Sequence, residues 1–175
     1  MIYDAVVQEI VFYAKNGKAF IDMPHEQLAT FEQCYRIDLT RRYPVAAALL
    51  WVAISEADQI AAWMRFPVEL EARMGGAIHI DFGGQGSIEG TVCDLEAPFL
   101  FAYTWGDSFV KWSVSGDGGS SELHFSHIGV RAELAKGLAA GWHAFLDQLE
   151  AYLSSTAPPE GRFQQLSKDY VKLKL

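Results

Sequence analysis

The chain has 175 residues, of which 50% are apolar and 21% charged, so we expect a single domain with a sizeable core. Its formal net charge of −8 argues against nucleic acid as a partner, because nucleic-acid binders need an excess of Lys and Arg to neutralise phosphates. The longest strongly apolar stretch, residues 45–54, is too short to cross a bilayer, so no membrane insertion is expected. No basic segment followed by an apolar run opens the sequence, which predicts a cytoplasmic protein without a signal peptide.

Residues 1–32 are predicted to form an N-terminal extension whose main feature is a β-hairpin. Residues 6–14 are strand-like, Asn16 and Gly17 form a strong signal for a two-residue turn, and residues 18–23 alternate again. A short helix over residues 6–14 is the alternative. The hairpin could cover an open sheet edge, cap a cavity mouth or pair with a second subunit, so a homodimer remains an open alternative.

Residues 33–155 are predicted to form the main domain, which begins with a half-buried strand ending near Tyr43. Two short helices follow, the first over residues 45–54 and the second carrying Trp63. Six strands come next, each with apolar side chains at every second position and joined by turns too short for parallel crossovers. An antiparallel meander is therefore expected, with a β-bulge where the alternation slips near Cys93.

After Gly129 the apolar period changes from two to about 3.6 residues, which predicts a long helix from Ala132 to Ser154. Its expected apolar stripe is Leu134, Leu138, Trp142, Phe145, Leu149 and Tyr152. Such a helix would be about 34 Å long, enough to lie across a whole sheet. Two prolines then end the domain and leave a tail, residues 156–175, that either forms a short helix or stays mobile.

These elements predict an α+β fold in which a curved antiparallel sheet wraps around the C-terminal helix. Each strand must bury its apolar face against the helices, and a strongly bent sheet on one helix rarely fills completely. An internal cavity is therefore expected between the sheet and the long helix.

Short motifs along the same region carry a family resemblance. They are Leu50-Trp51, Ser55-Glu56-Ala57-Asp58 with Trp63, Gly75-Gly76, Gly90-Thr91-Val92, Ala97-Pro98, Phe101 to Trp105, Leu123 to His127, and Gly141-Trp142. In this order they resemble the SRPBCC (START-like) superfamily and its subgroup related to the C-terminal domain of the activator of heat-shock-protein-90 ATPase. The resemblance implies the helix-grip fold. It does not imply one activity, since that superfamily includes carriers, cyclases, oxygenase subunits and a chaperone activator.

Eight aromatic side chains are expected to point into the space between the sheet and the long helix. They are Trp63, Phe82, Phe101, Tyr103, Trp112, Phe125, Trp142 and Phe145. In a filled interior these rings are core, whereas around a cavity they would line a site for a small molecule. His127 shares the inward parity of its strand, so it is either a hydrogen-bonded core histidine or, with Tyr103, a polar anchor for a ligand.

Binding of a small hydrophobic or amphipathic ligand in the internal cavity is the preferred functional hypothesis. The alternatives are a pocket-based enzyme, such as an aromatase or cyclase, and a protein-interaction module of the chaperone-activator type. No catalytic motif identifies catalytic residues, and no cofactor is expected. No metal site is expected either, because Cys34 and Cys93 lack ligand spacing and His124 and His127 should point to opposite faces of a strand.

Overall fold

The computed structural model describes residues 11–14 and 34–172. Its strands are β1 (Val11–Ala14), β2 (Cys34–Tyr43), β3 (Val68–Leu70), β4 (Ala77–Asp81), β5 (Ser87–Glu96), β6 (Leu100–Trp105), β7 (Ser108–Ser115) and β8 (Ser121–Arg131). Its helices are α1 (Ala47–Ser55), α2 (Ala57–Met64), α3 (Ala132–Leu153) and α4 (Arg162–Tyr170), with a short 3-10 helix, η3, over Gly83–Gln85. Among the described residues, no helix is both long and apolar enough to cross a membrane.

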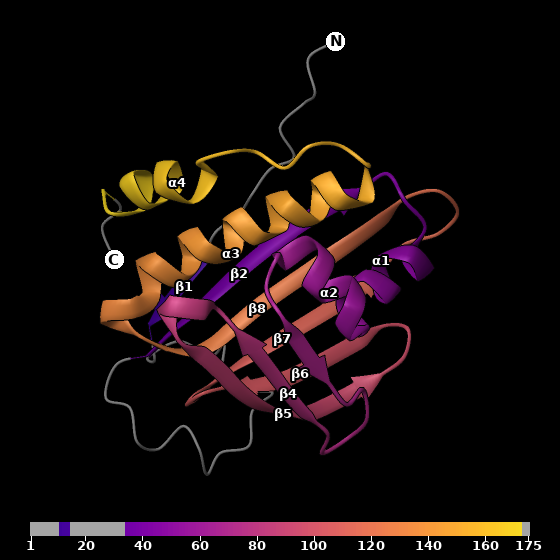
Figure 1. The fold of residues 1–175 in the computed structure, drawn as a ribbon, viewed down its shortest axis with the longest axis horizontal. Coiled ribbons are helices and arrows are strands. Elements are labelled where there is room, and N and C mark those ends of the chain that lie inside the picture. The colour runs from indigo at the N-terminus through magenta and orange to yellow at the C-terminus, as the bar shows by residue number, and fades with distance from the viewer. Residues whose placement is uncertain (1–10, 15–33, 173–175) are drawn as a thin grey trace.

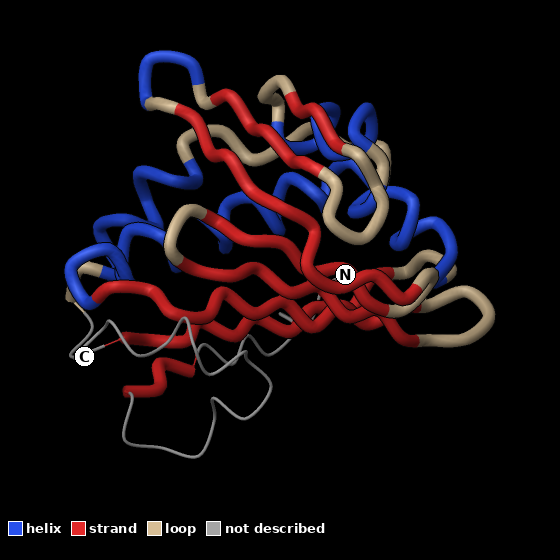
Figure 2. The backbone as a smooth tube through the Cα atoms, turned by 90° about the horizontal axis from the view of Figure 1, so that it is seen from below, coloured by secondary structure: helices blue, strands red, loops and turns tan. Residues whose placement is uncertain are grey.

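All eight strands belong to one antiparallel sheet, in the order β1-β2-β8-β7-β6-β5-β4-β3. The long helix α3 lies across the sheet, and α4 packs on α3 (Figure 1). Seen from below, the sheet bends, and the helices lie on its concave side (Figure 2). This arrangement confirms the predicted α+β helix-grip fold.

The predicted order of elements is confirmed from β2 to α3, with local differences. The register between β5 and β6 shifts between Val92 and Asp94, which places the expected bulge at Cys93. Strand β3 is short and ends at Leu70, and the Met74 side chain beyond it is exposed. In the N-terminal segment, β1 pairs antiparallel with β2, so residues 11–14 are a strand, whereas the rest of the predicted hairpin lies outside the described residues.

The buried face of α3 differs from the expected apolar stripe. Leu134 is 44% exposed, whereas Ala135, Ala139 and His143 are buried. The helix is covered on two sides, by the sheet on one and by α4 on the other. Small and polar side chains are therefore buried on a face that hydrophobic periodicity alone assigns to solvent.

Candidate functional site

A pocket of about 390 Å³ opens between α3, α4, the end of β6 and the segments that carry Phe66, Phe82 and Gln85. Its lining residues are Phe66, Phe82, Gln85, Trp105, Gly137, Leu138, Gly141, Trp142, Ala144, Phe145, Gln148 and Phe163. Because Gln85 and Phe163 are also exposed, the pocket is accessible from solvent. Its volume falls within the range of about 300–1,000 Å³ that is usual for small-molecule sites.

Three of the seven α3 residues that line the pocket are small, which leaves space beside the helix. Gly137, Gly141 and Ala144 follow one another at helical spacing. A Cβ atom built on Gly137 would have no neighbour within 4 Å, and one on Gly141 would meet only the Phe163 ring, at 3.9 Å. Larger side chains at these positions would fill the pocket.

Aromatic rings form the walls of the pocket. Phe82 contacts Phe66 edge-on, with ring centroids 5.0 Å apart, and stacks on Phe145 at 6.4 Å. Trp105 contacts Trp142 edge-on at 4.9 Å. These rings have different orientations and come from separate elements, so they offer both faces and edges to a bound ring.

His127 lies behind this wall and is fully buried. The Trp142 indole Nε1–H can only donate, so His127 Nδ1 accepts its hydrogen bond, at 2.8 Å. The proton of the neutral ring is then on Nε2, which donates to Ser108 Oγ at 2.7 Å, and Ser108 in turn donates to the Trp105 carbonyl at 2.7 Å. Burial lowers the pKa of His127 to about 3, so the histidine is neutral. One of its nitrogens holds the Trp142 indole, and the other is linked through Ser108 to the backbone of Trp105.

The structure places three of the nine expected cavity residues in the pocket lining: Phe82, Trp142 and Phe145. Trp63 lines a smaller hollow of about 170 Å³ on the other side of Gln148. The remaining five are buried in the core behind the pocket, namely Phe101, Tyr103, Trp112, Phe125 and His127.

The two side chains expected to be polar anchors, Tyr103 and His127, have partners within the core. The Tyr103 hydroxyl accepts a hydrogen bond from Trp112 Nε1 at 3.4 Å, and burial raises the pKa of Tyr103. Their hydrogen bonds therefore serve core and wall packing in this structure.

Several lining residues were not identified from the sequence. Phe66 and Gln85 lie outside the regular strands, and Phe163 belongs to α4, so strand parity could not place them. Gly137, Gly141 and Gln148 lie on α3, where their helical spacing was a usable signal. The Oε1 atom of Gln148 is buried and has no hydrogen-bond partner among the described residues.

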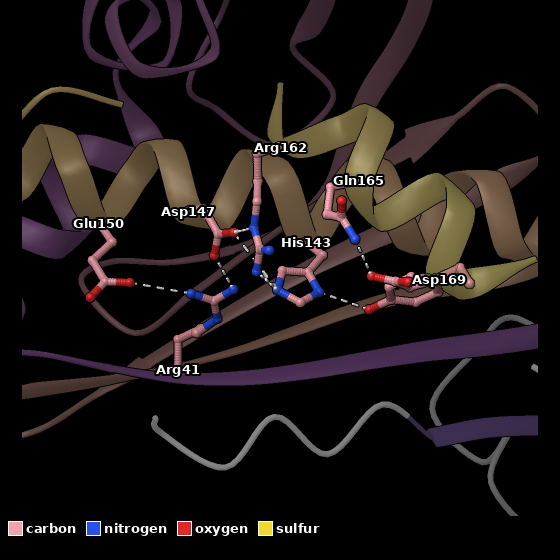
Figure 3. Close-up of polar contacts among 8 residues, drawn as sticks. Arg41, His143, Asp147, Glu150, Arg162, Gln165 and Asp169 are labelled. Atoms are coloured by element: carbon pink, nitrogen blue, oxygen red, sulfur yellow. Dashed lines mark hydrogen bonds and ion pairs between the residues drawn. The ribbon is translucent and has the colours of Figure 1, made fainter. Parts of the chain in front are cut away.

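A network of charged and polar groups fixes α4, and with it Phe163, against α3 and β2 (Figure 3). Arg41 on β2 donates to Asp147 on α3 at 2.5 Å, and Arg162 on α4 donates to the other oxygen of Asp147 at 2.6 Å. Arg162 also contacts His143 Nε2 at 3.3 Å, which leaves His143 Nδ1–H to donate to the Tyr170 hydroxyl at 2.9 Å. Burial lowers the pKa of His143 to about 4, with the nearby Asp147 carboxylate opposing this shift and Arg41 and Arg162 adding to it.

The pocket lining itself is uncharged. None of its residues, within the part of the chain that the structure describes, carries an ionisable side chain. The described residues also contain no group of three His, Cys, Asp or Glu side chains that could hold a metal ion.

Solved structures with the same fold come from several bacteria. CalU16 from Micromonospora echinospora superposes with a TM-score of 0.72 at 18% identity, over 94% of each chain. EF2215 from Enterococcus faecalis gives 0.71 at 16% identity, over 81% of this chain and 85% of its own. The protein encoded by BPP1335 of Bordetella parapertussis gives 0.68 at 25% identity, over 80% of this chain and 86% of its own.

A search of curated proteins gave no sequence match. The family model described as Activator of Hsp90 ATPase homolog 1-like protein matches residues 44–154, which include α1, α2, strands β3 to β8 and all of α3. This match covers more than half of the chain and agrees with the helix-grip architecture. The chain therefore belongs to the Activator of Hsp90 ATPase homolog 1-like family.

Proposed function

We propose that this protein binds a small apolar or amphipathic molecule in the pocket beside α3. The observation that carries the proposal is the open, aromatic-walled space of about 390 Å³ beside the hydrophobic core. Binding there would remove apolar ligand surface from water, which stabilises a complex by about 25 cal/mol per Å² before the costs of association.

The alternatives receive less support from the lining. A cyclase or aromatase would need polar groups placed over one ligand atom, and the polar side chains of the lining are the amides of Gln85 and Gln148, neither of which transfers protons near neutral pH. An interaction module would be expected to have a filled interior. Ligand binding therefore accounts best for the pocket.

The proposal is tested by filling the pocket from Gly137. Replacing Gly137 with Leu should extend a side chain into the open space, and it should not destabilise α3, because Leu has a higher helix propensity than Gly by about 0.8 kcal/mol. Gly137→Ala is the matched control, since it gains similar helix propensity and adds only a methyl group.

The measurement is titration with the uncharged fluorophore N-phenyl-1-naphthylamine, alongside the thermal midpoint of each variant. We expect saturable binding by the wild type and by Gly137→Ala, and at least tenfold weaker binding by Gly137→Leu at an unchanged or higher midpoint. Equal binding by both variants would place the probe elsewhere, and absence of saturable binding by the wild type would argue against an apolar pocket.

A further inference from the structure

We infer that Gln148 is the residue that determines ligand specificity, and that the ligand is an uncharged aromatic molecule whose hydroxyl group hydrogen-bonds to the Gln148 amide. The inference rests on the proposed function and goes beyond it, because it names the chemical class of the ligand and the side chain that recognises its polar group.

The first observation is the state of the Gln148 side chain. The structure leaves three buried side-chain polar atoms without a partner among the described residues, on Tyr43, Ser121 and Gln148. Of these, Gln148 alone contributes to the pocket lining. A buried acceptor without a partner is costly, so a ligand that supplies a donor at this point gains affinity beyond its apolar contacts.

The second observation is where the amide lies. Gln148 lines both the main pocket and the smaller hollow that Trp63, Arg65 and Tyr152 help to form. No hydrogen bond of the described chain holds Oε1, and the terminal torsion of a glutamine is broad, so the amide can turn toward the pocket. A glutamine amide both accepts and donates, and a hydroxyl group does the same, so the two groups match.

The third observation is the character of the remaining lining. Six of the twelve lining residues are aromatic, and none has a charged side chain. The Phe82 ring contacts Trp105 and Phe145 with centroids 5.8 and 6.4 Å apart, so a flat ligand ring would pack against this aromatic wall by offset or edge contacts. A carboxylate would lose its hydration without meeting a cation in this pocket, which disfavours an acidic ligand.

Gln85 offers a matched comparison, because it is the other amide of the lining. It is exposed on η3, so its side chain reaches water without a ligand. A ligand hydrogen bond that only replaces a hydrogen bond to water adds little binding free energy. We therefore assign recognition of the ligand hydroxyl group to Gln148 and not to Gln85.

The test is a cycle that pairs a change in the ligand with a change in the protein. Dissociation constants of naphthalene, 2-naphthol and 2-naphthoate are measured at pH 7.5 by tryptophan fluorescence for the wild type, Gln148→Leu and Gln85→Leu. The ratio of the naphthalene constant to the 2-naphthol constant isolates the hydroxyl group from the apolar contacts.

We expect this ratio to fall about tenfold in Gln148→Leu, which corresponds to the net binding free energy of one hydrogen bond. In Gln85→Leu the ratio should change less than twofold. The wild type should bind 2-naphthoate more weakly than 2-naphthol. Thermal midpoints close to that of the wild type are required of both variants, and Gln148→Met replaces Gln148→Leu if the latter is unstable.

The outcomes separate this inference from the proposed function. A ratio that is the same in the wild type and in the Gln148 variant overturns the role of Gln148 while leaving ligand binding in place. Tighter binding of 2-naphthoate than of 2-naphthol overturns the uncharged ligand class. A wild-type protein that binds none of the three probes overturns the proposed function, and this inference with it.

Discussion

A hydrogen-bonded chain of three side chains ties the core to the pocket wall. It runs from the Trp142 indole through His127 and Ser108 to the backbone of Trp105, with each link at 2.7–2.8 Å. Every donor in it has an acceptor, which is how a fully buried histidine can remain in an apolar core. Trp105 and Trp142 themselves line the pocket, so His127 and Ser108 position the wall from behind.

Removing one side chain of this hydrogen-bonded chain should lower stability, because the neighbouring polar group stays buried without a partner. Ser108→Ala leaves the buried His127 Nε2–H without its acceptor, so we expect the free energy of unfolding to fall by about 1–3 kcal/mol. Urea denaturation followed by tryptophan fluorescence measures this loss. Ser113→Ala on the outward face of the same strand is the control and should change stability by less than about 0.5 kcal/mol. Equal effects of the two substitutions would contradict the chain.

At the scale of elements, α4 completes the site. It carries Phe163 to the pocket, and its link to the main domain passes through Asp147 on α3, which receives both Arg41 and Arg162. The Arg41 and Asp147 side chains are only 6% and 12% exposed, so the pair is largely desolvated. Asp147 is shared by the two arginines, and Arg41 also contacts Glu150 at 3.3 Å, so loss of the Asp147 carboxylate removes charge compensation from both arginines at once.

We predict that Asp147→Asn lowers the free energy of unfolding by about 3 kcal/mol, since the buried Arg41 loses its shorter carboxylate contact and Arg162 loses its carboxylate partner as well. The control is Glu122→Gln, which removes the partner of Arg42 in a pair whose side chains are 76% and 40% exposed. That change should cost less than about 1 kcal/mol. Urea denaturation compares the two variants, and similar losses would show that the network around Asp147 is not what holds α4.

The sequence predicted the elements well because their signals are local. Alternation within β6, β7 and β8 correctly placed Phe101, Trp112 and Phe125 on the inward face, and all three are buried. The change of period after Gly129 gave α3 within one residue at its C-terminal end. Burial of α3 was harder to predict, because the packing of α4 buries His143 on a side that periodicity leaves exposed.

The pocket was less predictable because parity gives the direction of a side chain but not whether its neighbours fill the space. Phe101, Trp112 and Phe125 point inward, yet Trp112 packs edge-on against Phe125 at 4.6 Å and against Trp142 at 5.6 Å, and these contacts close the core there. Space remains where Gly137 and Gly141 face residues from loops and from α4. Those contacts join segments far apart in the chain, and no local pattern encodes them.

For the whole molecule, the buried histidines make stability depend on pH. The pKa of His127 is lowered to about 3 and that of His143 to about 4 in the folded protein, against about 6.5 in the unfolded chain. Below pH 6.5 the unfolded chain therefore binds protons that the folded protein does not. The stability that the two neutral histidines contribute is therefore fully present above pH 6.5, and it is lost as the pH falls toward their pKa values in the folded protein.

His127→Gln isolates the contribution of the fully buried histidine, because a glutamine amide can accept from Trp142 and donate to Ser108 but does not titrate. Near pH 5 one proton taken up only by the unfolded chain changes stability by about 1.4 kcal/mol per pH unit. We therefore expect the variant to be less stable than the wild type at pH 7.5, and its unfolding free energy to fall less steeply on acidification, by about that slope. Urea titrations at intervals from pH 7.5 to 4.5 give both curves, and parallel curves would mean that His127 is protonated in the folded core.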